Sequence, residues 1–227
     1  MDFTDWEPIY ERILADFGYD RAADERSRDL LAGLIEPFDL SRLDVEGRTV
    51  AIAGGADSLG DEHSTVRAAD VVFAASTAAD HLRDAGLAVD LVVTDLDKHP
   101  ETAVELSRSG TPVAVHAHGD NVGLIEEVVP AMAGANVLGT TQAEPVGPVR
   151  NFGGFTDGDR AAFLADHLDA TTLTFPGWDF DDPTVGPEKQ RKLEWAERLL
   201  VHLERRRGDR WTLLDDRRDD VDEPLSG

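Results

Sequence analysis

The chain has 227 residues, a formal net charge of −24, a pI near 4.4 and no cysteine. The absence of cysteine excludes a disulfide-stabilised scaffold and metal sites built from thiolates. The negative charge opposes nonspecific nucleic-acid binding, because such binding needs Lys and Arg side chains to neutralise phosphates. The length suits one sizeable α/β domain that buries most of its apolar surface without covalent cross-links.

The acidic residues are spread along the whole sequence, and Lys98, Lys189 and Lys192 are the only lysines. This composition resembles that of proteins adapted to molar intracellular salt, where a Debye length of roughly 3 Å screens the self-repulsion of an acidic surface. An ordinary acidic mesophilic protein is the alternative interpretation. We expect a halophilic protein.

The sequence contains no signal for a membrane or for export. No apolar run approaches the roughly 20 residues that are needed to cross a bilayer. The N-terminal stretch MDFTDWEPIYERI is acidic, whereas a signal peptide begins with basic residues. We therefore expect a soluble cytoplasmic protein that has no membrane partner.

Residues 1–45 are predicted to form a helical N-terminal region. Apolar residues at helical spacing run from Trp6 to Phe17, with Thr4 as the expected N-cap and Gly18 as the stop. A second helix is expected to follow Asp20 and to end just before Pro37. Its inner face is expected to carry Leu30, Leu31 and Leu34. The two helices form either a separate subdomain or arm, or they pack directly on the sheet.

Short apolar runs then alternate with helical segments, and the catalytic domain is expected to span 46–214. The predicted strands are 48–53, 71–75, 89–94, the run that ends at His116, 136–139 and 171–175. The predicted helices are 77–84, 100–109, 122–129, 161–168 and 188–207. This βαβα pattern indicates a Rossmann-like, mostly parallel sheet with helices on both faces. An edge strand at 211–214 and a disordered acidic tail at 215–227 complete the prediction.

Polar residues follow two of these strands at intervals of two. Asp95 and Asp97 follow the first, and His116, His118 and Asp120 end the second. Residues two apart in an extended chain point to the same side. Because ligands bind beyond the carboxyl ends of parallel strands, we expect these five side chains to converge on one site.

The two aspartates offer hard oxygen ligands, which suit Mg²⁺ because this ion keeps several waters and completes its shell with substrate phosphates. Alternatively, one of the two aspartates caps the following helix and only the other has a functional role. The histidines allow three roles. With Asp120 they could bind a transition metal, act as general acid or base, or donate hydrogen bonds to phosphate.

Glycine-rich loops form the second group of candidates. Gly54 and Gly55 follow the first strand, where an exposed backbone and a helix N-terminus could bind phosphate, although a tight turn is the alternative. The loop 151–160 (NFGGFTDGDR) contains Asp157, Asp159 and Arg160. A loop of this kind at the mouth of a parallel sheet often carries substrate contacts, although a turn with an N-cap would look similar.

These residues indicate an α/β protein with an acidic Mg²⁺-binding centre and phosphate-binding loops. A nucleotide-dependent phosphoryl or diphosphoryl transferase fits this combination. A metal-dependent hydrolase would look similar. Composition and spacing do not separate the two classes.

Several longer motifs resemble one family in matching order over residues 48–203. They are VVTDLD, VHAHGDN, GTTQ, NFGGFTDGDR, and G-x-D-F followed by K-x-x-K-L. The sequence resembles the archaeal 6-hydroxymethyl-7,8-dihydropterin pyrophosphokinases of the MptE-like family. The resemblance implies a fold similar to the thiamin pyrophosphokinase catalytic domain. It also implies diphosphate transfer from ATP to the pterin hydroxymethyl group with release of AMP, in folate or methanopterin-type coenzyme biosynthesis.

The resemblance implies the following roles for individual residues. The catalytic residues are Asp95, Asp97, His116, His118, Asp120 and Arg160, and Mg²⁺ is held by Asp95, Asp97 and Asp120. ATP is expected to contact Gly54, Gly55, Ser58, Lys98, Thr140, Thr141 and Gln142. The substrate is expected to contact Asn121, Asn151, Gly153, Gly154, Asp157, Asp159 and Asp179, with Asn151 and Asp157 at the amide and amino edge of the pterin.

Three other functions remain open at this point, and a homo-oligomer is possible in each case. Thiamin pyrophosphokinase has the same type of fold and the same donor chemistry. The wider family also resembles proteins of surface glycosylation, so a nucleotide-sugar-dependent glycosyltransferase is an alternative, although the compact length of the chain argues against it. A non-catalytic nucleotide-binding protein would bind ligand without turnover.

Overall fold

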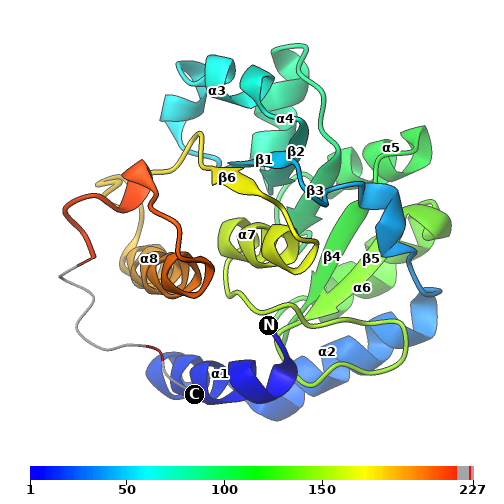
Figure 1. Ribbon diagram of the computed structural model, residues 1–227. Helices are drawn as coiled ribbons and strands as arrows, with labels where there is room; N and C mark the ends of the chain where they lie inside the picture. The colour runs from blue at the N-terminus through cyan, green and yellow to red at the C-terminus, as the bar shows by residue number, and fades with distance from the viewer. Residues whose placement is uncertain (219–224, 226–227) are drawn as a thin grey trace.

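The computed structural model describes residues 1–218 and 225, and it contains a six-stranded sheet in which every pair of neighbouring strands is parallel (Figure 1). The strand order is β5-β4-β3-β2-β1-β6. The strands are β1 (Thr49–Ala53), β2 (Val71–Ala75), β3 (Leu91–Thr94), β4 (Val113–Ala117), β5 (Val137–Thr141) and β6 (Thr172–Thr174). The predicted α/β class with a parallel sheet is confirmed. Because all strands run the same way, their carboxyl ends meet at a single edge.

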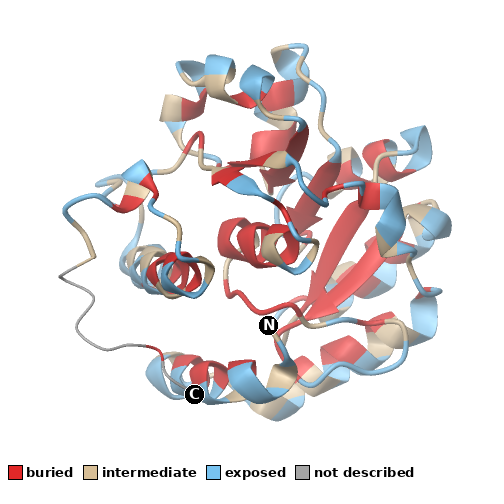
Figure 2. Cartoon of the chain, in the orientation of Figure 1, coloured by how far each residue is buried: buried red, intermediate tan, exposed pale blue. Residues whose placement is uncertain are grey.

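Helices cover both faces of the sheet, as a parallel sheet requires if its strands are to be buried. The crossovers α3 (His63–Ala68), α4 (Ala78–Asp84), α5 (Pro100–Ser109) and α6 (Val122–Val128) share one hydrophobic core with one face of the sheet. The helices α7 (Asp157–His167) and α8 (Pro187–Arg207) share a second core with the other face. The strands are therefore buried along most of their length (Figure 2). Among the described helices, none is both long and apolar enough to cross a membrane.

The helical N-terminal region is confirmed, and its two helices divide between the two cores. Helix α1 (Phe3–Phe17) places Trp6 and Ile13 in the core that contains α7 and α8. Helix α2 (Arg21–Leu34) contacts α6, β4 and β5 and belongs to the opposite core. The region thus packs on the sheet at its β5 end. The division into an N-terminal region and a catalytic domain remains a prediction.

Several local expectations are wrong, and each has a physical reason. Helix α1 begins at Phe3 with Asp2 in the N-cap position, so Thr4 lies inside the first turn. Helix α7 begins at Asp157, because Thr156 and Asp159 form a capping box that starts the helix four residues before the predicted Ala161. The segment predicted as an edge strand contains the 3₁₀ helix η5 (Thr212–Leu214).

The predicted disordered tail lies only partly within the described residues. Positions 219–224 and 226–227 lie outside them. Just before these positions, Arg217 forms an ion pair with Glu197, and Arg218 forms one with the buried Glu204. The first residues of the acidic segment are therefore attached to α8.

Helix α2 offers a matched test of how the N-terminal region packs. Leu31 is fully buried, whereas Leu34, which the sequence placed on the same inner face, is 41% exposed. Leu31→Ala should lower the free energy of unfolding by about 3 kcal/mol, because it removes buried methyl groups and leaves a cavity. Leu34→Ala should change it by less than about 0.5 kcal/mol. Denaturant titration in constant salt measures both values, and equal effects would contradict this packing.

Candidate active site

A cavity of about 590 Å³ opens at the carboxyl edge of the sheet. Its wall includes residues that follow each of the six strands, from Gly54 after β1 to Gly177 after β6. The first turns of α7 and α8 and the α1–α2 turn complete the wall. The structure brings eleven of the predicted site residues to this wall: Gly54, Gly55, Asp95, Asp97, Lys98, His118, Asp120, Gln142, Asp157, Arg160 and Asp179.

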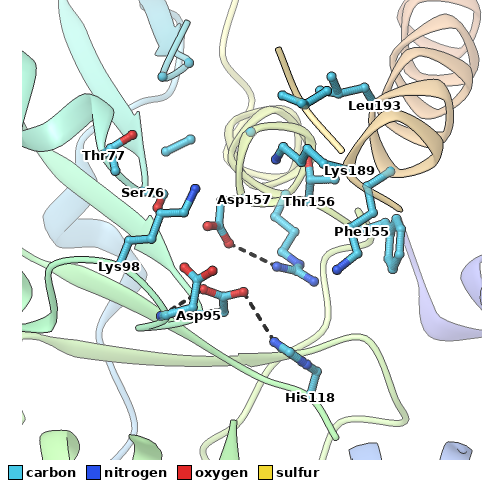
Figure 3. Close-up of a pocket in the computed structure, with 18 of the residues that line it drawn as sticks. Ser76, Thr77, Asp95, Lys98, His118, Phe155, Thr156, Asp157, Lys189 and Leu193 are labelled. Atoms are coloured by element: carbon cyan, nitrogen blue, oxygen red, sulfur yellow. Dashed lines mark hydrogen bonds and ion pairs between the residues drawn. The ribbon is translucent and has the colours of Figure 1, made fainter. Parts of the chain in front are cut away.

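Asp95 and Asp97 both line the cavity and form an unequal acidic pair. Figure 3 shows Asp95 pointing toward His118. Burial raises the pKa of Asp95, but hydrogen bonds from His118 and Asp97 outweigh burial and hold this pKa well below its ordinary value. Burial, together with the hydrogen bond and negative charge of Asp95, raises the pKa of Asp97 to about 6. The two carboxylates thus repel each other unless a bound cation neutralises part of their negative charge.

This donor set fits a magnesium ion without a third carboxylate. Among the described residues, no group of three or more acidic, histidine or cysteine side chains could hold a metal. The predicted third ligand, Asp120, lies at the cavity wall with an exposed side chain, and its role as a metal ligand stays a prediction. Mg²⁺ binds through one or two carboxylates, waters and substrate phosphates. The pair Asp95 and Asp97 meets that requirement.

The two histidines occupy different environments. His118 borders the cavity, and its Nε2 lies 3.3 Å from Oδ2 of Asp95. His116 is buried away from the main cavity, where its Nδ1 lies 3.1 Å from Oγ1 of Thr140. Burial, with the positive charge of Arg160 next in size, lowers the pKa of His116 well below its usual value. His116 is therefore a neutral side chain behind the site.

Arg160 supplies a buried positive charge beside the acidic pair. Its Nη1 lies 3.0 Å from Oδ1 of Asp157, and its Nη2 lies 3.4 Å from Oε1 of Gln142. Burial, followed by the charge of Asp95, raises the pKa of Asp157 to about 7 in spite of the guanidinium. Asp157 can therefore change between an acceptor and a donor near neutral pH.

The remaining predicted residues lie outside the main cavity, and most have a structural task. Asn121 donates to the carbonyl oxygens of Asp95 and His116, and so ties the β3 and β4 loops together. Asn151 donates to the carbonyl oxygens that follow β5. The others are Ser58 in a 3₁₀ turn, Thr140 and Thr141 within β5, Gly153 and Gly154 before α7, and Asp159 in the capping box.

Gly154 packs against the backbone of Arg160 and so helps to position this residue. Its φ is +92°, and a Cβ at this position would come within 2.6 Å of Cα of Arg160. Only glycine combines this backbone conformation with so close an approach. The NFGG segment thus allows the loop to pass against α7, and it contributes to the site by placing Arg160.

Sequence reasoning missed much of the outer wall. Ser76 and Thr77 lie at the end of β2, where the same strand-end rule would have found them. Trp178 donates from Nε1 to the carbonyl oxygen of Ile52 and packs against Gly158. The remaining missed residues come from α8, from the loop before α7 and from the α1–α2 turn: Lys189, Lys192, Leu193, Phe155, Thr156 and Tyr19. They add aromatic and cationic side chains to the cavity that contains the acidic pair.

A buried hydrogen-bond network connects the N-terminal helices to the site. The carboxylate of Asp24 on α2 accepts hydrogen bonds from the Tyr10 hydroxyl, the Gln142 amide and the backbone N–H of Gly119. Trp6 donates to the carbonyl oxygen of Gln142 at 2.8 Å. Gln142 and Gly119 both line the cavity. The network therefore fixes the loops that follow β4 and β5.

Asp24→Asn should disturb this network, because an amide turns a donor toward groups that already donate. The cost should be about 2 to 3 kcal/mol of unfolding free energy. Tyr10→Phe removes only one donor and should cost about 1 kcal/mol. Thermal and denaturant unfolding of both variants measures these effects, and an Asp24→Asn protein as stable as wild type would contradict the network.

Comparison with known proteins identifies the family of this chain. Residues 31–184 match the family model described as 6-hydroxymethylpterin diphosphokinase MptE-like. A protein from Methanothermobacter thermautotrophicus named 6-hydroxymethyl-7,8-dihydropterin pyrophosphokinase is 38% identical over 93% of this chain and 100% of its own length. Proteins with the same name from Methanocaldococcus jannaschii and Pyrococcus furiosus are 34% and 35% identical over 89% of this chain, and 96% and 94% of their own lengths are covered. The chain therefore belongs to the 6-hydroxymethylpterin diphosphokinase MptE-like family.

Proposed function

We propose that this protein transfers diphosphate from ATP to the hydroxymethyl group of 6-hydroxymethyl-7,8-dihydropterin in a Mg²⁺-dependent reaction that releases AMP, in pterin coenzyme biosynthesis. The names of the three relatives support the acceptor and the reaction. The observation that carries the proposal is the cavity itself. It combines the acidic pair, the buried Arg160 and the ammonium group of Lys98 at the carboxyl edge of a parallel sheet.

In the proposed reaction, the pterin hydroxyl oxygen forms a bond to the β-phosphorus of ATP. The bond from that phosphorus to the α,β-bridging oxygen breaks, and the oxygen leaves as part of AMP. The hydroxyl proton passes to a base. Such transfers depend mainly on positioning and on the stabilisation of spread negative charge, and the cavity residues are arranged for both.

Asp95 and Asp97 would hold the magnesium ion, which supplies positive charge to the phosphate oxygens. Arg160 contributes a second, fixed positive charge, because Gln142 and Asp157 hold its guanidinium in place. His118 is the histidine that can reach a bound hydroxyl, because it borders the cavity and His116 does not. His118 is therefore proposed as the proton acceptor through Nδ1, because its Nε2 donates to Asp95 and its Nδ1 accepts only a long 3.4 Å contact from the backbone N–H of Asp120.

The pterin would lie against the far side of the cavity, where Phe155 and Trp178 line the wall. Aromatic faces suit a flat heterocycle. Arg160 binds Oδ1 of Asp157, so Oδ2 can accept a hydrogen bond from the amino edge of the pterin. Asn151 is not available for the amide edge, because it binds the chain after β5.

A direct test offers the purified protein three mixtures containing ATP and Mg²⁺: one with the pterin alcohol, one with thiamin and one with no acceptor. We expect AMP to form only with the pterin. AMP with thiamin instead would identify thiamin pyrophosphokinase activity, and binding of ATP without turnover under all conditions would indicate a non-catalytic nucleotide-binding protein. The assay should be run from low to molar KCl, because the net charge is −24.

The acidic pair makes metal binding depend on pH. The pKa of Asp97 is raised to about 6, so a proton occupies this carboxylate below pH 6 and competes with the cation. Affinity for Mn²⁺, used as a spectroscopic probe, should fall as pH decreases through about 6 and level off above pH 7. Electron paramagnetic resonance titration between pH 5 and 8 measures this. Constant Mn²⁺ affinity down to pH 5 would contradict the raised pKa of Asp97 and its role in binding the cation.

A further inference from the structure

The distribution of lysine in this chain singles out the cavity. The chain has 22 basic Lys and Arg residues, of which only Lys98, Lys189 and Lys192 are lysines. All three line the same cavity. The ammonium group of lysine is a compact point charge, and it is a common ligand for phosphate. Among the described residues, arginines elsewhere carry most of the surface ion pairs, for example Arg21 with Glu7 and Arg83 with Glu105.

The three lysines differ in whether they already have a partner. Lys192 pairs with Glu188 at 3.2 Å, and Glu188 accepts a hydrogen bond from the Tyr19 hydroxyl at 3.0 Å. This contact attaches the first turns of α8 to the α1–α2 turn. By contrast, neither Lys98 nor Lys189 has a hydrogen bond or ion pair with any described residue.

Lys98 and Lys189 approach the cavity from two sides. Lys98 comes from the loop after β3, and Lys189 comes from the first turn of α8 (Figure 3). Asp95 and Asp97 line the same cavity as both lysines. Asp157 also lines this cavity, and the positive charge of Lys189 opposes the rise in its pKa.

We propose that Lys189 is a phosphate-binding residue that, together with Lys98, binds the phosphate chain of the nucleotide in the cavity that Asp95 and Asp97 also line. This proposal rests on the proposed function and adds to it a residue of α8, more than 90 positions away from Lys98 in the sequence. The contact of Lys192 with Glu188 and Tyr19 holds α8 in the position that Lys189 needs. The ligand chemistry is that of a linear polyphosphate.

The test uses Lys189→Met, with Lys189→Arg as the conservative variant and Arg206→Met as the matched control. Arg206 is exposed on the same helix, and 17 residues separate it from Lys189, or about 25 Å at 1.5 Å per residue. The control therefore removes the same charge far from the cavity. Calorimetry measures binding of inorganic tripolyphosphate and, separately, of adenosine, at one fixed Mg²⁺ and KCl concentration at which circular dichroism shows every variant to be folded.

Lys189→Met should bind tripolyphosphate about tenfold more weakly, because one charged contact is lost. Its affinity for adenosine should stay within about twofold of wild type, Lys189→Arg should recover part of the loss, and Arg206→Met should match wild type. Wild-type affinity of Lys189→Met for tripolyphosphate would overturn the proposal. An equal loss for adenosine would also overturn it, because it would show general damage to the cavity.

Measurements of turnover distinguish a failure of this phosphate contact from a failure of the proposed function. If wild type forms AMP with the pterin and Lys189→Met has an unchanged KM for ATP, the function stands and the phosphate contact is wrong. If wild type forms no AMP but Lys189→Met still loses tripolyphosphate affinity selectively, the phosphate contact stands and the reaction is wrong.

Discussion

Asp95→Asn is expected to lower AMP-forming turnover by at least about 10³-fold while the protein stays folded. Asp95 is the more acidic member of the pair, and hydrogen bonds from His118 and Asp97 stabilise its charged form. The amide removes the negative charge that the proposed cation needs. Turnover should be measured across a range of Mg²⁺ concentrations, with circular dichroism to confirm the fold.

Asp120→Asn provides the comparison for this variant. Asp120 also lines the cavity, but among the described residues it does not form a metal-binding group with Asp95 and Asp97. Its loss of turnover should be less than about tenfold, because only a peripheral charge changes. Equal losses for Asp95→Asn and Asp120→Asn would restore the three-carboxylate ligand set that the sequence predicts. Retention of most turnover by Asp95→Asn would disprove the metal assignment.

Arg160→Met is expected to lower kcat by about 10² to 10³-fold, because it removes a fixed positive charge next to the transferred phosphates. Arg160 is 8% exposed, and Asp157 and Gln142 hold its guanidinium, so solvent cannot replace it. Single-turnover kinetics with saturating ATP and pterin separate this effect on chemistry from an effect on binding.

Arg160→Lys tests whether charge alone is sufficient. Lysine keeps the charge but cannot reach both partners with a planar fork. We expect Arg160→Lys to recover only part of kcat. Full recovery would show that the contacts with Asp157 and Gln142 are unimportant, and unchanged kcat in Arg160→Met would remove Arg160 from the mechanism.

The sequence predicted the sheet well because each strand is a short apolar run with a distinct polar end. The predicted limits of the strand Val71–Ala75 and the helix Pro100–Ser109 agree with the structure. A parallel sheet also places the carboxyl ends together, so the convergence of Asp95, Asp97 and His118 followed from spacing alone. These features depend on local periodicity and on a single rule of topology.

Features that depend on tertiary packing were not predictable in the same way. The hydrophobic pattern of α2 places Leu34 on the inner face, but the polar residues Asp24 and Ser27 occupy that face, because they bond to the loops after β4 and β5. The sequence could not show that Asp159 is used in a helix cap whereas Asp157, two residues earlier, faces the cavity.

The outer wall of the cavity shows the same limit. Tyr19 and Lys189 are far apart in the sequence, and neither lies in a strand-end motif. They meet at the cavity because α1 and α8 pack on the same face of the sheet. Only the fold brings the first turn of α8 to the cavity that contains the acidic pair, and the proposal for Lys189 depends on that placement.

The most direct test of the central claim follows the phosphorus atoms of ATP. ³¹P nuclear magnetic resonance of the reaction of wild type with ATP, Mg²⁺ and the pterin alcohol distinguishes diphosphate transfer from single-phosphate transfer. We expect equal amounts of AMP and of a pterin diphosphate ester, with no ADP. ADP together with a pterin monophosphate would contradict it.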